Sequence, residues 1–479
     1  MNQALAQEII AHHLRLFGVG KVNEEHGVIL MVSPREEDVA AVRAQTAGGG
    51  LVIAVLPEPA FLASFGVTEA AIVLPPIALR YCTCSSPARS ELKTLHPAFG
   101  YRQTQGETIV VLQNGMAVWF WLPLESGGIV VIGTDLAGDL LRYRQGDPAC
   151  ADNRPTQAMW GIAGERPNYL FESQLSGEDG THRHADWWAM ALAETVAGKL
   201  RKPLADMLPG GAPGAVIVTG DDDQAYLEKY DEQLKLLGDT PITYLLHPLT
   251  RHTQKSMRAM RKRNPGVDFG IHPDALEAPG RYGELFDEQV AWYRKLTGGT
   301  PTSLRNHGFL NDGYWGHLEA WLKHGVRISS NLPGFDGRVL NGSLLPARMA
   351  WRGTLTPHWS VLTVIGDGVR FASGMSDEDA AERVRNVADC IRQSGIPGVM
   401  VLNLHPQNVT ETRAMHHAAM EIIRSGFVAW NLRQCWEWFQ QRDDGRLCLA
   451  DTSCQGHWFG QQWRKFQGWL GQNMADVRS

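Results

Sequence analysis

Short apolar runs bounded by glycine alternate with helical stretches over roughly the first 130 residues. Five runs predict buried strands, in chain order HGVILMV, GLVIAVL, ETIVVLQ, AVWFWLP and GGIVVIG. Helices are predicted at Glu36–Gln45 and in the TDLAGDLLRY segment that follows the last of these strands. This order of strands and helices is typical of proteins whose helices cover both faces of a parallel sheet. We therefore expect a doubly wound α/β domain at the N-terminus.

The second half of the chain repeats the alternation of strand and helix more regularly. Seven strands are predicted, at GAVIVTG, PITYLLHP, VDFGIH, PTSLRNH, VRISSNL, VLTVIG and GVMVLNLHP. Helices are predicted between many of them, at Gln224–Leu237, Gln254–Arg263, Tyr282–Leu296, Trp315–His324 and Asp377–Ser394. Alternation over this length favours a (β/α) barrel, whose active site lies at the carboxyl ends of its strands.

Between these halves the composition changes to one rich in Gly, Pro, Asp and His. One helix is predicted there, at Asp186–Arg201, and the LPGGAPGA segment ending at Ala215 is the clearest break in the pattern. We expect an accessory domain at 1–146, a connector at 147–212, the barrel at 213–445 and a Trp-rich tail at 446–479. In the tail, Trp463, Phe466 and Leu470 predict one apolar face of an amphipathic helix.

The composition narrows the class of protein. A length of 479 residues favours two domains, and 44% hydrophobic with 20% charged residues is typical of folded globular chains. A net charge of -6 without a long basic tract argues against a nucleic-acid partner. We expect no membrane span and no secretory leader, and the seven scattered cysteines fit a reducing, cytoplasmic compartment. The sixteen tryptophans are a mild indication of a carbohydrate ligand, because indole faces stack on sugar rings.

Charged and imidazole side chains follow several of the predicted barrel strands. The first strand is followed by Asp221, Asp222 and Asp223, the third by His272, the fourth by Arg305 and His307, and the last by His405. Adjacent carboxylates repel one another, so three in a row after a buried strand indicate a cation or proton that offsets the repulsion. A single histidine is more often a core residue, but this set on four strand ends predicts an active site.

The order of these strand-end residues resembles the polysaccharide deacetylase superfamily, also called the NodB-homology or carbohydrate esterase 4 type. The TGDDD segment is similar to the first motif of that family, which implies that Asp221 is the general base and Asp222 the metal ligand. A TGDxD register would make Asp223 the ligand instead. The family's second motif has two histidines four residues apart, and here His272 is followed by Leu276. The resemblance covers about residues 215–440.

In this resemblance His307 is the natural replacement for the missing histidine. Arg305 matches the arginine of the third motif and would keep the base ionised, while His405 matches the last motif and would be the general acid. A site of one Asp and two His with open positions for water is typical of zinc, and we expect one divalent ion. Such an ion activates water for attack on an amide, with the Asp as base and the His as acid.

The implied substrate is an acylamino sugar, most simply an N-acetylated one. A cytoplasmic protein would meet a lipid-linked or nucleotide-linked precursor of a surface polysaccharide, such as a lipopolysaccharide O-antigen. The acyl group and the sugar stay open, and a homo-oligomer is compatible with the sequence. The N-terminal half resembles a noncatalytic class I glutamine amidotransferase-like, or flavodoxin-like, domain, because Cys82 and Cys84 lack the glycine-flanked elbow of a nucleophile.

Two alternatives remain. The missing second histidine could mark a degenerate deacetylase that binds or assembles carbohydrate without cleaving it. A glycoside hydrolase would need two carboxylates on separate strand ends, for which Asp312 and Glu319 are the candidates.

Overall fold

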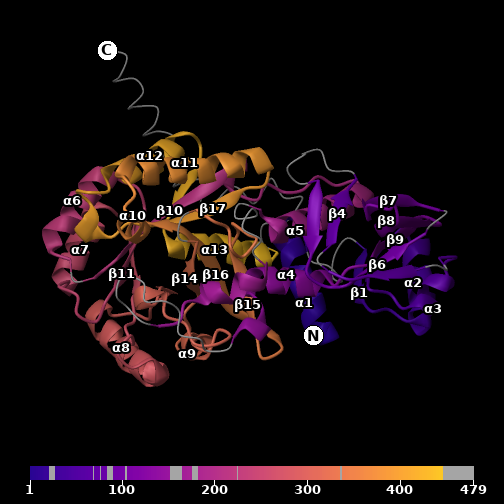
Figure 1. The fold of residues 1–479 in the computed structure, drawn as a ribbon, viewed down its shortest axis with the longest axis horizontal. Helices are drawn as coiled ribbons and strands as arrows, with labels where there is room; N and C mark the ends of the chain where they lie inside the picture. The colour runs from indigo at the N-terminus through magenta and orange to yellow at the C-terminus, as the bar shows by residue number, and fades with distance from the viewer. Residues whose placement is uncertain are drawn as a thin grey trace, which may run out of the picture.

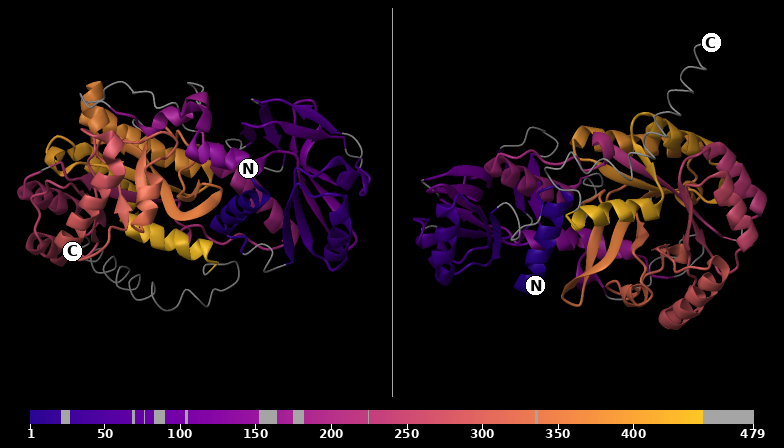
Figure 2. Two further views of the ribbon diagram at one scale, coloured as in Figure 1. Left: turned by 90° about the horizontal axis from the view of Figure 1, so that it is seen from below. Right: turned by 180° about the vertical axis from the view of Figure 1, so that it is seen from behind.

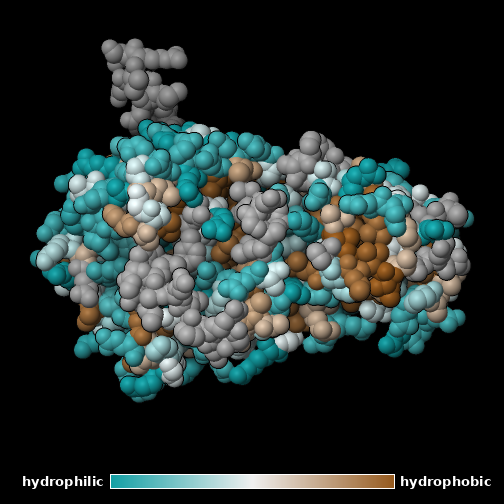
Figure 3. Space-filling model, viewed as in Figure 1, coloured by the Kyte–Doolittle hydropathy of each residue, from teal (hydrophilic) through white to brown (hydrophobic). Residues whose placement is uncertain are grey.

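The computed structural model describes residues 1–20, 27–67, 70–75, 77–82, 90–102, 105–151, 164–174, 182–223, 225–334 and 337–445. It contains two sheets side by side along the long axis of the molecule, an N-terminal sheet and a C-terminal barrel (Figure 1). Figure 3 shows that the face seen in this view is largely hydrophilic, with an apolar area over the N-terminal sheet.

The N-terminal sheet is mixed, with few parallel neighbours. Its strands are β1 (Val28–Val32), β2 (Leu51–Val55), β3 (Ala70–Val73), β4 (Ile77–Tyr81), β5 (Glu91–Thr94), β6 (Ala98–Tyr101), β7 (Glu107–Val111), β8 (Ala117–Leu124) and β9 (Gly127–Ile132). Strands β1, β2 and β9 pair in parallel, and every other pairing between described strands of this sheet is antiparallel.

A doubly wound, flavodoxin-like or amidotransferase-like arrangement is therefore not shown. The physical reason is the length of the connections, because parallel neighbours need crossovers of a dozen or more residues whereas antiparallel ones can be joined by tight turns. Strands β8 and β9 are separated only by Glu125 and Ser126, and β7 and β8 by residues 112–116. Neither connection leaves room for a helix.

Five α-helices accompany the N-terminal sheet and the predicted connector: α1 (Gln3–Leu16), α2 (Val39–Ala47), α3 (Pro59–Ala63), α4 (Leu136–Gln145) and α5 (His184–Leu200). The last of these is the helix predicted at Asp186–Arg201. Its Trp188 packs on Trp119 of the sheet with ring centroids 5.0 Å apart, and its indole N–H donates to the carbonyl of Lys93. The predicted connector thus contributes a helix that covers the N-terminal sheet.

Helix α1 lies between the two sheets and beside the last barrel helix (Figure 2). Its His12 hydrogen-bonds through Nδ1 to Oδ1 of Asp443, and the same oxygen accepts from Arg15 of α1. Oδ2 of Asp443 accepts from Arg348 of the barrel. Asp443 is almost completely buried, so these partners supply the compensation that a buried carboxylate requires. The start of the chain is thereby bound to the end of the barrel.

The C-terminal half is a closed barrel of seven parallel strands, each at a predicted position. They are β10 (Gly214–Asp221), β11 (Ile242–Leu246), β12 (Val267–Ile271), β13 (Ser303–Leu304), β14 (Ile328–Pro333), β16 (Thr354–Gly366) and β17 (Gly398–Asn403), closed by pairing of β10 with both β11 and β17. Two strands were not predicted: β15 (Ala347–Trp351), antiparallel to β16, and β18 (Val428–Trp430), which also pairs with β10. Strands buried on both faces explain the continuous apolar runs.

The helices around the barrel are α6 (Leu227–Leu237), α7 (Gln254–Arg263), α8 (Tyr282–Thr297), α9 (Leu318–Lys323), α10 (Asp367–Ser373), α11 (Asp377–Ser394), α12 (Arg413–Arg424) and α13 (Leu432–Asp443). The five predicted helices are confirmed, with the start of α9 later than expected. The amphipathic helix predicted in the tail lies outside the described residues. Among the helices that the structure describes, none has the length and apolarity to cross a membrane.

Candidate active site

The predicted strand-end residues converge on one cavity at the carboxyl end of the barrel. The cavity has a volume of about 230 Å³, and its lining includes Asp221, Asp223, His272, His307 and His405. The residues come from the ends of β10, β12, β13 and β17, which the parallel register brings to the same rim. Two of the other predicted residues, Asp222 and Arg305, lie in the wall behind this lining, where both are completely buried.

Asp221 ends β10 and accepts hydrogen bonds on both carboxylate oxygens. Nη1 of Arg305 donates to Oδ1 at 2.8 Å, and Nδ2 of Asn403 donates to Oδ2 at 2.8 Å. Burial alone would raise the pKa of this carboxyl, but the charges of Arg305, His272 and His405 outweigh burial and lower it. Asp221 is therefore an ionised carboxylate held in one orientation.

The guanidinium of Arg305 is completely buried, and each of its three nitrogens donates a hydrogen bond. Besides Asp221 it donates to the side-chain oxygens of Thr219, Ser330 and Thr363 and to the carbonyl of Ser330, at distances of 2.9–3.1 Å. A buried cation is tolerated when it is paired and every N–H has an acceptor. The pair of Arg305 and Asp221 thus forms a rigid floor under the cavity.

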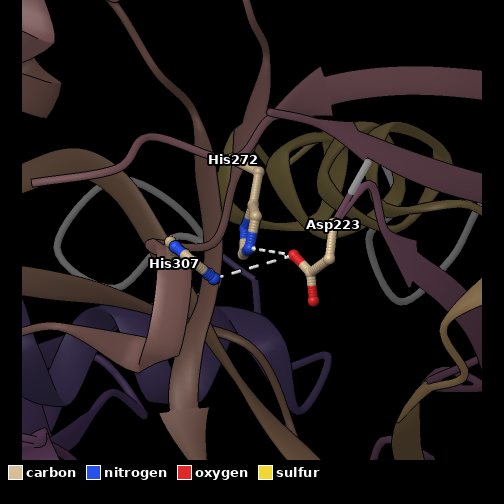
Figure 4. Close-up of side chains that lie close together, drawn as sticks. All are labelled: Asp223, His272 and His307. Carbon is tan, nitrogen blue, oxygen red and sulfur yellow. Dashed lines mark ion pairs between the residues drawn. The ribbon is translucent and has the colours of Figure 1, made fainter. Parts of the chain in front are cut away.

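Asp223, His272 and His307 form a group that could hold a metal ion (Figure 4). Oδ1 of Asp223 lies 3.4 Å from Nε2 of His272 and 3.8 Å from Nε2 of His307. Ligand atoms about 2.0–2.1 Å from a tetrahedral zinc lie roughly 3.4 Å from one another, close to these separations. Oδ1 of Asp223 is buried and has no hydrogen-bond donor, so the donor set fits a divalent cation.

The tautomer of His272 suits a ligand role. Its Nδ1 donates to the carbonyl of Arg305 at 2.7 Å, which leaves Nε2 as the nitrogen facing Asp223. Burial would raise the pKa of the Asp223 carboxyl, but the nearby rings of His272, His405 and His307 lower it strongly, so this carboxylate is ionised. Burial would lower the pKa of His272, but Asp221 and Asp223 raise it, so a bound cation would compete with a proton for Nε2.

Asp222 lies apart from this group, in the wall of the barrel. It is completely buried, its Oδ1 accepts a hydrogen bond from the hydroxyl of Tyr230, and its backbone N–H donates to Leu245. Burial raises the pKa of its carboxyl despite this hydroxyl partner. Of the two registers that the sequence left open, the geometry favours the one in which Asp223 faces the histidines.

His405 is held by a carboxylate that sequence reasoning missed. Its Nδ1 hydrogen-bonds to Oδ1 of Asp367, and its backbone N–H donates to Oδ2 of the same carboxylate at 2.8 Å. Nε2 of His405 faces the cavity, 3.4 Å from Oδ2 of Asp223 and 3.7 Å from Oδ2 of Asp221. Burial works against the charged ring, but the nearby carboxylates, with Asp367 the strongest, raise the pKa of His405 to about 10.

The carboxylates suggested for a glycoside hydrolase do not belong to this cavity. Neither Asp312 nor Glu319 is among the lining residues, and Glu319 forms an exposed ion pair with Arg352. In the N-terminal half Cys82 is exposed, and Cys84 lies outside the described residues.

No family model matches the sequence, and no curated protein matches it. Among solved structures, the chain is similar to the PuuE allantoinase, with 16% identity over 51% of this chain and 95% of that one and a TM-score of 0.40. A probable polysaccharide deacetylase from Pseudomonas aeruginosa PAO1 matches with 14% identity over 51% and 97% of the two chains and a TM-score of 0.37. The peptidoglycan deacetylase PdaC from Bacillus subtilis matches with 14% identity over 49% and 95% and a TM-score of 0.32.

Proposed function

We propose that this chain is a metal-dependent hydrolase that removes an acyl group, most simply acetyl, from an amino sugar of a surface-polysaccharide glycan or its precursor. The observation that carries the proposal is the group of Asp223, His272 and His307, which shares one cavity with a fixed carboxylate at Asp221 and a protonated imidazole at His405. Amide hydrolysis can use a metal ion to activate water, a general base to accept the proton of that water and a general acid to protonate the leaving amine.

Asp223, His272 and His307 would hold the ion, leaving positions open toward the cavity. When bound, a divalent ion lowers the pKa of a coordinated water from about 15.7 to near 7 and polarises an acyl oxygen. Zinc is the ion we expect for one carboxylate and two imidazoles.

Asp221 would accept the proton that the attacking water loses. Its pKa is lowered, so it is ionised at neutral pH, and its hydrogen bonds to Arg305 and Asn403 fix the carboxylate beside the cavity. A base that needs no reorganisation before proton transfer lowers the barrier.

His405 would donate a proton to the amine as the C–N bond breaks. With a pKa near 10 it carries that proton at neutral pH, and Asp367 holds Nδ1 so that the proton on Nε2 points into the cavity. The water supplies OH to the acyl carbon and H to the base, and His405 supplies the proton that completes the free amine. The products are a carboxylic acid and an amino sugar.

The cavity also offers an apolar surface for the substrate. Its lining includes Phe309, Pro333, Val369 and Phe371, and Phe371 is 47% exposed. Aromatic faces at the mouth of a polar site suit the flat apolar face of a pyranose ring, while small apolar groups suit a short acyl chain.

The test is metal content and deacetylation measured on the same preparations. Wild type, His307→Ala and the control His417→Ala, a change on the exposed face of α12, are compared by elemental analysis. We expect about one divalent ion per chain in wild type and control, and a loss in His307→Ala. The same proteins are assayed for acetate release from N-acetylglucosamine oligomers.

Activity that follows the metal content supports the proposal. Wild type that holds no ion, even after incubation with zinc, would refute it and favour the noncatalytic carbohydrate-binding alternative.

A further inference from the structure

A second carboxylate lies on the opposite side of His307 from Asp223. Oδ2 of Asp274, in the segment that follows β12, is 3.3 Å from Nδ1 of His307 and 3.1 Å from Nε2 of His247, which follows β11. The His247 and His307 rings meet edge to face with centroids 5.2 Å apart. His307 therefore stands between two acidic groups, one at each ring nitrogen.

The partners of this group distinguish it from the metal group. Nδ1 of His247 accepts the backbone N–H of Leu249 at 3.1 Å, so its proton is on Nε2 and is donated to Asp274. Oδ1 of Asp274 accepts the backbone N–H of Leu276 at 3.0 Å. Both oxygens of Asp274 thus have hydrogen-bond donors, in contrast to Oδ1 of Asp223, which has none.

The backbone of Asp274 is also fixed. Gln289 of α8 accepts the N–H of Asp274 at 2.8 Å and donates to its carbonyl at 2.6 Å, which closes a pair of hydrogen bonds between helix and loop. Asp274 is therefore held through its backbone by Gln289 of α8 and through its carboxylate by His247 at the end of β11. This is the geometry of an anchor for another side chain.

We propose that Asp274, braced by His247 and Gln289, is a positioning residue that orients His307 so that Nε2 is its ligating nitrogen. The inference rests on the proposed metal site and deepens it. Ligation through Nε2 leaves Nδ1 as the nitrogen of the ring that bears the proton. Nδ1 is buried without a hydrogen-bond partner among the described residues, and Oδ2 of Asp274, 3.3 Å away, is the acceptor within reach. A carboxylate on the far nitrogen fixes the tautomer and makes the imidazole a stronger ligand.

The need for such an anchor follows from where His307 lies. It begins the short 3₁₀ turn at His307–Phe309, whose Gly308 has a positive φ of 58°, and its side chain is 25% exposed. His272 is completely buried and has its own acceptor in the carbonyl of Arg305. A ligand on a turn at the edge of the cavity has less packing to fix its ring, so Asp274 supplies the orientation that packing gives His272.

The test is zinc affinity, measured by competition with a chromophoric chelator, in wild type, Asp274→Asn and His247→Gln. Asp274→Asn is expected to weaken zinc binding about 10–100-fold, and His247→Gln is expected to weaken it less. Asp287→Asn is the matched control, because Asp287 pairs only with Lys323 and His324 on the surface among the described residues. After chelator treatment, wild type and the three variants should have the same midpoint of thermal unfolding. This result would separate an effect on ligand position from an effect on folding.

Nitrogen chemical shifts of the His307 ring give a readout that a purely structural role would not change. With zinc bound to wild type we expect a proton on Nδ1 and the metal on Nε2, and in Asp274→Asn a mixture of ring states. If Asp274→Asn binds zinc as tightly as wild type does, the inference is overturned. It is also overturned if wild type binds two ions per chain and His247→Gln loses one of them. If His307→Ala still binds zinc as wild type does, the proposed metal site itself fails.

Discussion

Replacing Asp367 by asparagine should remove most of the rise in the pKa of His405 above its ordinary value. The rise in the pKa of His405 from its ordinary value of 6.5 to about 10 corresponds to about 5 kcal/mol, at 1.36 kcal/mol for each pKa unit. Asp367 is completely buried and hydrogen-bonds directly to the ring. Opposite charges about 4 Å apart attract by about 4 kcal/mol at an effective dielectric constant of 20, so the pKa in Asp367→Asn should fall to about 7–8.

The stability of the protein should report the same change. A histidine whose pKa is raised by folding contributes stability that is fully present below pH 6.5 and is lost as the pH rises through about 10. The unfolding free energy of wild type should therefore decline across that range, by up to about 5 kcal/mol from this group. In Asp367→Asn the decline from His405 should end near pH 8 and be about 2 kcal/mol or less.

The assay is urea unfolding at half-unit steps from pH 6 to pH 10, with nitrogen chemical shifts of His405 followed over the same range. Asp389→Asn, which breaks a surface pair with Arg392, is the matched control and should keep the wild-type pH dependence. The other groups that titrate in this range are common to all three proteins, so the difference between their curves isolates His405. If His405 titrates near pH 10 in Asp367→Asn, Asp223 and Asp221 hold the proton and the role given to Asp367 is wrong.

Three further predictions follow from the site and from the contact between the two ends of the chain. Asp223→Asn should lose the bound ion while Asp222→Asn keeps it, as measured by elemental analysis; the reverse pattern would assign the ligand role to Asp222. Asp443→Asn should lower the unfolding free energy in urea by about 3–5 kcal/mol at pH 7, because it leaves two arginines and the buried ring of His12 without their carboxylate. The lowered pKa of Asp443 makes this contribution present at neutral pH, and the contribution is lost as the pH falls below about 3.9. A variant as stable as wild type would contradict this prediction. Phe371→Ala should raise KM for acetylated oligomers several-fold with kcat nearly unchanged, whereas a fall in kcat alone would place the ring near the reacting bond.

The barrel was predictable because its strands are buried on both faces and its connections are long. Strands β10, β11 and β17 are mainly apolar with every residue buried, which is the pattern of a parallel sheet covered by helices. The N-terminal sheet has equally apolar runs, such as β8 and β9, and the same interpretation failed there. The two-residue connection between them was the contrary signal, because no parallel crossover fits in it.

Part of the candidate site could be predicted from residues that are neighbours in the sequence, and part depends on residues that are far apart in it. Side chains alternate along an extended chain, so Asp221 and Asp223 share one side and Asp222 the other. That periodicity favours the register in which Asp223 is the ligand and could have been used at the sequence level. Asp367 has no such signal, because it lies 38 residues before His405 and begins a helix after a different strand. Its role follows only from the adjacency of β16 and β17 in the barrel.

The adjacency of strands also explains how His307 comes to lie beside His272 and Asp223. In the barrel β12 pairs with β13 through Ile271 and Leu304, so the residues that follow, His272 and Arg305, emerge side by side at the rim. His307 lies two residues after Arg305. Its backbone N–H donates to the carbonyl of Pro273 at 2.9 Å, which continues the pairing beyond the ends of β12 and β13. In the proposed metal site, neighbouring strand ends therefore supply two of the ligands. Because His307 lies on a turn, its orientation would have to come from a side chain, and Asp274 is the carboxylate placed to provide it.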